Sequence, residues 1–125
     1  MRGLHSHSAL IAAAALLVSA ANAHAQSVVA SEIEDALARG SQAYATGNRA
    51  EAARLFAEAI RHDPHDPRPY YLRALCLARA GHSEEARADL VVAAALESRN
   101  PYQYPVADAV ARLAVNDRSL LNQFR

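Results

Sequence analysis

The chain has 125 residues, the length of one small domain, and its 13 basic and 13 acidic residues give a net charge of zero. A chain with this charge balance has no excess of basic residues of the kind that nucleic-acid-binding proteins show, so we expect no nucleic-acid partner. The single cysteine, Cys76, cannot form an internal disulfide. Packing alone must therefore hold the fold together, and we expect Cys76, which stands in an apolar run, to be a buried small hydrophobe.

Residues 1–25 have the three parts of a secretory signal peptide. Arg2 precedes an apolar run from Ala9 to Ala21, and the small-residue triplet Ala23-His24-Ala25 follows it. The run is shorter than the roughly 20 apolar residues that a membrane-spanning helix needs. We therefore expect cleavage after Ala25, a mature domain of residues 26–125 that is periplasmic or secreted, and no membrane insertion after cleavage.

A helical pattern follows this segment. Ser31, with Glu34 three residues later, is a capping-box pattern that predicts a helix start. The tripeptide Thr46-Gly47-Asn48 predicts the end of that helix. Between them, apolar or small residues recur at three- and four-residue spacing and define one face: Ile33, Ala36, Leu37, Gly40, Ala43 and Tyr44.

Three further helices are predicted along the chain. Asn48 and Glu51 predict the cap of a second helix, which ends at Asp63-Pro64. The same plan then recurs, with a helix over residues 69–80, a turn at Gly81-His82-Ser83 in which Ser83 is the expected cap, and a helix over residues 84–97.

The two halves of this plan are an internal repeat. A shift of 34 residues aligns the turn glycines, the small positions and the large apolar positions of the second helices: Gly47 with Gly81, Ala52 with Ala86, Phe56 with Leu90, and Ala59 with Ala93. A small residue at Ala52 or Ala86 lets the antiparallel partner helix approach closely. One such hairpin cannot bury its apolar face alone, so we predict an all-α fold of stacked antiparallel helical hairpins, a short α-solenoid.

The C-terminal residues keep only part of the pattern. A third shift brings Tyr70 onto Tyr104, but Gly81 onto Val115. We expect a degenerate third repeat or a capping unit, with a helix over about residues 106–115 and a short helical end near residues 118–123.

Residues 40–64 and 74–90 resemble the tetratricopeptide repeat family. The glycine turn, the small residue, the following Phe or Leu and the closing Asp-Pro all fall in register. The chain departs from the family where Ala36 replaces an early aromatic residue and Ser98 replaces the second closing proline. The resemblance implies repeat one at about residues 32–66, repeat two at about 67–100, and a degenerate or capping unit at about 101–125.

The resemblance also implies a concave surface, formed by the first helix of each unit, in which a protein or peptide binds. Arginine pairs bidentately with carboxylates and tyrosine offers rigid contact area. Alternatively, the arginines form a solvated face and Tyr44 and Tyr71 belong to the core. The lysine and asparagine pattern with which related repeats clamp a terminal carboxylate is missing here. The predicted partner-binding residues are Tyr44, Arg68, Tyr71, Arg79 and Arg112, with Glu34, Leu37, Ser41 and Leu75 in the same register.

Two polar clusters contain residue types that occur in catalytic or metal sites. His62-Asp63-Pro64-His65-Asp66-Pro67 contains zinc-ligand residue types, but its prolines break the helix that would align them, and Asp-Pro is typical of a turn between repeats. His82 with Glu84 and Glu85 stands at a helix start, where acidic residues complement the helix dipole. We predict no metal, no cofactor and no catalytic residue.

The predicted function is therefore an exported protein-protein interaction module, not an enzyme. One alternative is a self-associating structural or assembly subunit of the cell envelope, because a short array exposes apolar end faces and is able to form homo-oligomers. Another is a small enzyme or metal carrier that uses the histidines.

Overall fold

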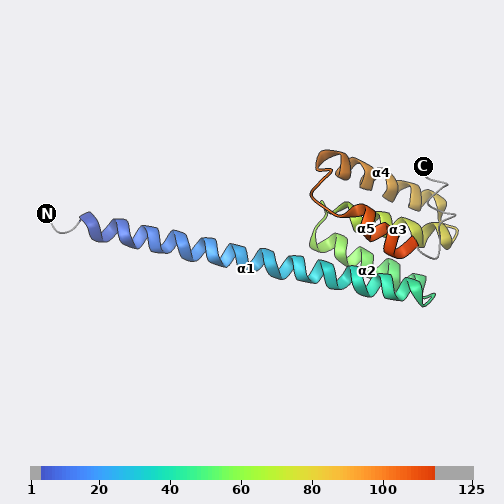
Figure 1. Cartoon of the computed structure of the whole chain (residues 1–125), viewed down its shortest axis with the longest axis horizontal. Helices are drawn as coiled ribbons and strands as arrows, with labels where there is room; N and C mark the ends of the chain where they lie inside the picture. Colours follow the sequence, from blue (N-terminus) through green and yellow to red (C-terminus); the bar gives the residue numbers. More distant parts are fainter. Residues whose placement is uncertain (1–3, 115–125) are drawn as a thin grey trace. The chain divides into compact units, whose positions relative to one another are not determined.

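The computed structural model describes residues 4–114, and the prediction of an all-α fold of antiparallel hairpins is confirmed over that range (Figure 1). The predicted helical end near residues 118–123 lies outside the described residues. The chain divides into two compact units, with the boundary between Ser31 and Glu32. In chain order the helices are α1 (Leu4–Ala45), α2 (Arg49–His62), α3 (Pro67–Arg79), α4 (Ser83–Arg99) and α5 (Val106–Ala114).

The N-terminal unit exposes its large apolar side chains. Leu10, Ile11 and Leu16 are 65–71% exposed. Near the N-terminus, α1 is long and apolar enough to cross a membrane, a property that signal sequences share with membrane spans. The apolar helix is thus compatible with the predicted signal peptide, whose cleavage stays a prediction.

The predicted helix start at Ser31 is wrong, because Ser31 lies within α1. The capping box needs a preceding residue that leaves the helical conformation. No glycine or proline stands between Leu4 and Ser31, and alanine, the strongest helix former, is the commonest residue there. The helix therefore continues through Ser31.

Glycine turns close the first helix of each hairpin, as predicted. Gly47 and Gly81 have φ of +84° and +86°, a conformation that glycine adopts without steric penalty. After the first turn, the Asn48 side chain accepts a hydrogen bond from the Glu51 N–H at 3.2 Å and caps α2. After the second turn, His82 is the capping residue and makes no side-chain cap bond. The expected cap Ser83 is instead the first residue of α4.

The second unit has one apolar core, with α3 at its centre against α2, α4 and α5. Gly40 permits a close approach in this core, since an added Cβ would lie 2.5 Å from the Phe56 ring. Ala52 and Ala86 are 0% and 1% exposed, as their role at the helix contacts requires. Cys76 is buried as predicted, and its burial raises the pKa of the thiol to about 12.

Candidate functional site

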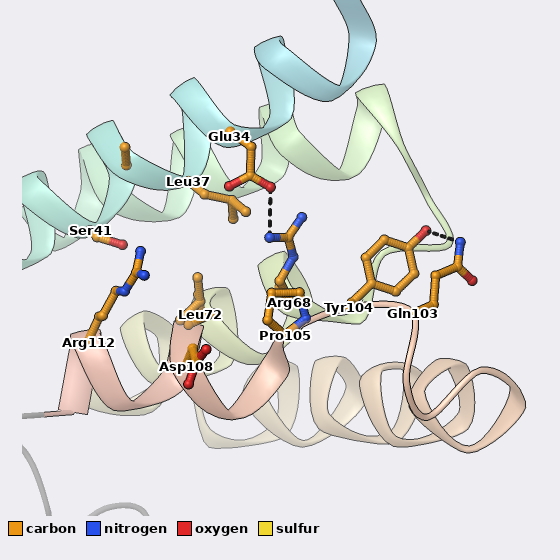
Figure 2. Close-up of a pocket in the computed structure, with 12 residues that line it drawn as sticks. Glu34, Leu37, Ser41, Arg68, Leu72, Gln103, Tyr104, Pro105, Asp108 and Arg112 are labelled. Carbon is orange, nitrogen blue, oxygen red and sulfur yellow. Dashed lines mark hydrogen bonds and ion pairs between the residues drawn. The ribbon is translucent and has the colours of Figure 1, made fainter. Parts of the chain in front are cut away.

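A groove of about 480 Å³ lies within the second unit, between α1, α3, α5 and the loop before α5 (Figure 2). Its two walls run for two helical turns each, from Glu34 to Ser41 on α1 and from Pro105 to Arg112 at α5. Seven helical residues span about 10 Å, which sets the length of the groove. The lining residues are Glu34, Leu37, Ala38, Ser41, Arg68, Leu72, Gln103, Tyr104, Pro105, Asp108, Ala109 and Arg112.

The groove combines an apolar floor with charged ends. Leu37 and Leu72 are 6% and 1% exposed, so they form a fixed base. Glu34 stands at one end with Arg68, and Arg112 points toward Ser41 at the other (Figure 2). An extended segment lying along the floor would therefore meet a different charge at each end.

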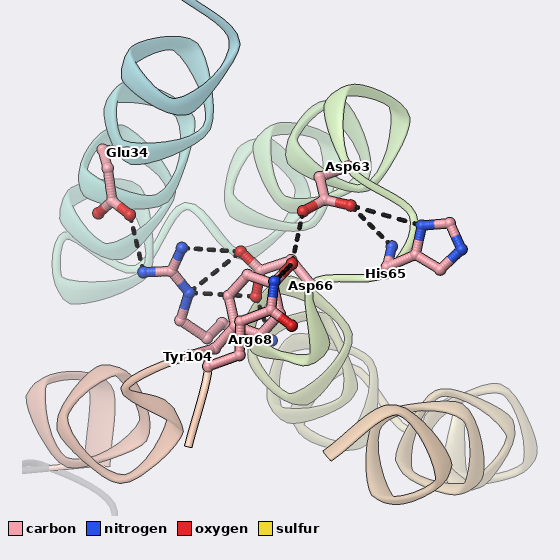
Figure 3. Close-up of polar contacts among 7 residues, drawn as sticks. Glu34, Asp63, His65, Asp66, Arg68 and Tyr104 are labelled. Carbon is pink, nitrogen blue, oxygen red and sulfur yellow. Dashed lines mark hydrogen bonds and ion pairs between the residues drawn. The ribbon is translucent and has the colours of Figure 1, made fainter. Parts of the chain in front are cut away.

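Arg68 is the best-fixed charge of the groove (Figure 3). Its Nη2 lies 2.7 Å from Asp66 Oδ2, and its Nε donates to both Asp66 oxygens at 3.1 Å. Its remaining nitrogen, Nη1, lies 2.8 Å from Glu34 Oε1. All three guanidinium nitrogens are therefore occupied by the protein's own carboxylates.

Asp66 explains why this cluster forms where α3 begins. Its side chain accepts a hydrogen bond from the Arg68 N–H at 2.9 Å, which caps α3, and the residue is 0% exposed. Burial disfavours the charged form of Arg68, but the hydrogen bonds and charges of Asp66 and Glu34 outweigh burial and raise the pKa of Arg68 above its ordinary value. Arg68 is thus a permanent, internally neutralised cation.

Tyr104 connects this cluster to the turn between the hairpins. Its ring lies under the Arg68 guanidinium at 5.6 Å, and its hydroxyl donates to Asp63 Oδ2 at 2.8 Å (Figure 3). Burial, together with the bond to Asp63, raises the pKa of Tyr104 to about 12. The phenol therefore stays a hydrogen-bond donor at physiological pH and holds the loop before α5 against the turn.

The turn His62-Asp63-Pro64-His65-Asp66-Pro67 has a structural role. Asp63 also accepts a hydrogen bond from the His65 N–H at 3.0 Å, and Asp66 caps α3. Within residues 4–114 no group of three or more His, Cys, Asp or Glu residues is placed to hold a metal ion. The residues of the turn join the two hairpins through hydrogen bonds of their own.

The predicted partner-binding residues do not lie together. Arg68 and Arg112 line the groove, but Arg68 is only 8% exposed. Tyr71 is half-buried and its hydroxyl donates to Glu97 at 2.6 Å, joining α3 to α4. Arg79 is exposed in the last turn of α3, and Tyr44 packs against the core, so neither lines the groove.

The residues predicted from the sequence include one wall of the groove but few residues of the other wall. Glu34, Leu37 and Ser41 line it as their register indicated, whereas Leu75 is buried in the core. The wall at α5 was represented by Arg112 alone. The alignment of Tyr70 with Tyr104 was the available signal for it, because the following helix then takes the first-helix position of a third unit.

One comparison with known proteins gives a match. Residues 43–104 fit the family model described as tetratricopeptide repeat. No curated protein and no solved structure matches the chain. The matched range contains both glycine turns, the whole of α2, α3 and α4, and Tyr104 of the groove.

Proposed function

The chain belongs to the tetratricopeptide repeat family, and from this premise we propose that it is an exported module that binds a protein or peptide in the groove between α1, α3 and α5. Members of this fold act through the surface that their stacked helices present. We assign repeat one to residues 32–66, repeat two to residues 67–100 and a degenerate or capping unit to residues 101–125.

The observation that carries the proposal is an accessible groove with a buried apolar base and an ion-paired end. Leu37 and Leu72 form its base. At one end, Arg68 is paired with both Asp66 and Glu34, so its buried charge is neutralised. A preformed surface of this kind binds with little loss of conformational entropy. The exposed residues Ala38 and Asp108 leave the lining open to a partner.

We propose binding without catalysis or cofactor. Within the part of the chain that the structure describes, the groove lining includes no histidine and no cysteine that could serve as a general base or a nucleophile. Arg68 and Asp66 are held by one another, and the buried Cys76 does not line the groove. The groove therefore offers contacts and fixed charges to a ligand.

The export part of the proposal depends on residues 1–25. The exposed apolar helix in this region is compatible with a signal sequence. Mass spectrometry of the protein recovered after expression of the full chain should give a mature form that begins at Gln26. An intact N-terminus in a membrane fraction would instead show an anchored protein and contradict cleavage.

A pair of tryptophan variants tests the binding groove. Ala38 is exposed and lines the groove, so Ala38→Trp should fill it, whereas the matched change Ala88→Trp places the same bulk on an exposed position of α4. In pull-downs from an envelope or secreted fraction, we expect one partner with the parent and with Ala88→Trp, and its loss with Ala38→Trp. Circular dichroism should show equal folding of the three proteins. Recovery of the same partner with all three would refute the groove.

Self-association is the second candidate, and the face of α4 favours it. Val91 and Val92 are 65% and 40% exposed on this helix, and Tyr102 in the following loop is 99% exposed. Such residues would be covered in a homo-oligomer that stacks through this end. Sedimentation of the parent and of a Val91→Gln, Val92→Gln variant separates the candidates. A dimer that the variant abolishes would support assembly, and a parent that stays monomeric at all accessible concentrations would exclude it.

A further inference from the structure

We infer that the groove selects an extended segment that carries a basic side chain and an acidic side chain about 10 Å apart, with apolar residues between them. This inference rests on the proposed function and specifies the ligand of that same groove. It is based on where the charged side chains lie along the lining in the structure. Their arrangement there differs from the one that the positions of the arginines in the sequence suggest.

The Glu34 end of the groove is the acidic end. Two carboxylates, those of Asp66 and Glu34, share the single guanidinium of Arg68, so one negative charge is in excess. The side chain of Asp66 is fully buried and both its oxygens accept bonds from Arg68. The Glu34 side chain is 63% exposed, and only its Oε1 contacts Arg68. The excess charge is therefore accessible to a ligand at Glu34, and a lysine or arginine side chain is its complement.

The Arg112 end is the basic end. Arg112 is exposed and points into the groove toward the Ser41 hydroxyl (Figure 2). A guanidinium beside a hydroxyl offers several donors to a carboxylate. Asp108 lies one helical turn before Arg112 and weakens the positive potential there. We therefore expect this end to contribute less affinity than the Glu34 end.

The distance between the ends sets the spacing of the ligand charges. Glu34 and Ser41 are two helical turns apart, about 10 Å. An extended chain of the polyproline II type covers that distance in about three residues and, with three residues per turn, presents the first and fourth side chains on the same side. The intervening side chains lie over Leu37 and Leu72, so apolar residues fit there, and the carboxylate of Asp108 disfavours an acidic residue in the middle.

The test uses labelled peptides with an Arg-Leu-Leu-Glu core and neutral versions in which glutamine replaces either the Arg or the Glu. Fluorescence anisotropy with protein purified after expression of the full chain should show the tightest binding for the doubly charged core. Replacing its Arg should weaken binding about fivefold and replacing its Glu about twofold, in keeping with partly exposed ion pairs. Added salt should reduce both differences.

Protein variants assign each charge to its partner. In Glu34→Gln, the doubly charged core and the version without Arg should bind equally, while the contribution of the peptide Glu remains. In Arg112→Gln, only the contribution of the peptide Glu should disappear. Asp35→Asn and Arg39→Gln are matched controls, because they change the net charge by the same amounts at an exposed pair that does not line the groove.

Each other outcome overturns the inference. Equal affinities for the charged and neutral cores, tighter binding of an all-glutamate core, or no binding of any core would do so. Equal effects of Glu34→Gln and Asp35→Asn would assign the selectivity to net charge and overturn the assignment to the groove. If Ala38→Trp abolishes binding of the natural partner while the peptides give any of these results, the proposed function stands. Only the charge pattern is then rejected.

Discussion

The two helical hairpins share one repeat pattern, but different chemistry holds them together. In the hairpin of α1 and α2, Leu55 is 2% exposed in the apolar core. The equivalent position in α4, 34 residues later, is Asp89, which is 7% exposed. Its carboxylate accepts two hydrogen bonds of 2.7 Å from Arg73 of α3.

Arg73, which pairs with Asp89, also differs from its equivalent in the first hairpin. Arg39 is the equivalent of Arg73 in the first hairpin, yet it pairs with Asp35 of its own helix at 3.4 Å on the surface. At this position the first hairpin therefore relies on apolar packing, and the second relies on a partly buried ion pair. A repeat fixes where two helices meet and leaves open which interaction holds them.

The largest expected effect comes from removing the main aromatic contact of the first hairpin. Phe56 is 0% exposed, so Phe56→Ala should lower the free energy of unfolding by about 3–5 kcal/mol. Leu90, its equivalent in α4, is only half-buried, and Leu90→Ala should have less than half that effect. Urea unfolding followed by circular dichroism measures both. Equal losses would contradict the difference between the hairpins.

The ion pair of the second hairpin gives the next effect. Asp89→Ala leaves Arg73 without its main partner and should lower the free energy of unfolding by about 2 kcal/mol, less than for a fully buried pair because the Arg73 side chain is 29% exposed. Replacing both residues by leucine should restore most of the loss, because it removes the unpaired charge and places an apolar side chain where the first hairpin has Leu55. A double variant as unstable as Asp89→Ala would argue that this site requires polar groups.

The close approach at Gly40 gives a smaller effect. Gly40→Ala should destabilise the fold by about 1 kcal/mol, because the clash with Phe56 exceeds the gain in helix propensity. In a Phe56→Leu background, the same change should become neutral or stabilising. Thermal unfolding of the four proteins of this cycle measures the coupling. An unchanged effect in the Phe56→Leu background would show that Phe56 is not the residue that excludes a side chain.

The helix caps give the smallest effect. Asn48 and His82 occupy equivalent positions with similar backbone angles, φ −86° and ψ 74° against φ −87° and ψ 63°, but only Asn48 makes a side-chain cap bond. Asn48→Ala should lower the free energy of unfolding by about 1 kcal/mol, and His82→Asn should raise it by about 0.5–1 kcal/mol. A destabilising His82→Asn would indicate that the imidazole has a role of its own, such as its contact with Glu85.

These comparisons also show which features the sequence revealed. Glycine turns, small residues at helix contacts and apolar spacing are local signals, and they located α2, α3 and α4 together with the core positions Ala52 and Ala86. The start of the first helix was misplaced at Ser31 because a capping motif has an effect only where the preceding residues can leave the helix. Asn48 at a true turn became a cap, and Ser31 within α1 did not.

The site was harder to predict because its residues come from distant parts of the chain. The pairing of Arg68 with Glu34 joins residues on different helices, and periodicity gives no information on which carboxylate an arginine meets. Arg68 was therefore expected to face a ligand, whereas it is held by Asp66 and Glu34. Tyr104 and Asp108 follow the two repeats in the sequence, where the repeat signal is weakest.

The most direct test of the groove is site-specific photo-crosslinking in cells that express the full chain. A photoreactive phenylalanine analogue is placed at Ala38 in the groove and, in a matched protein, at Ala88 on α4. We predict an adduct with a different protein from position 38 and none from position 88. Adducts only from position 88 would contradict a binding groove, and adducts from that position with a second copy of the same chain would favour assembly through α4.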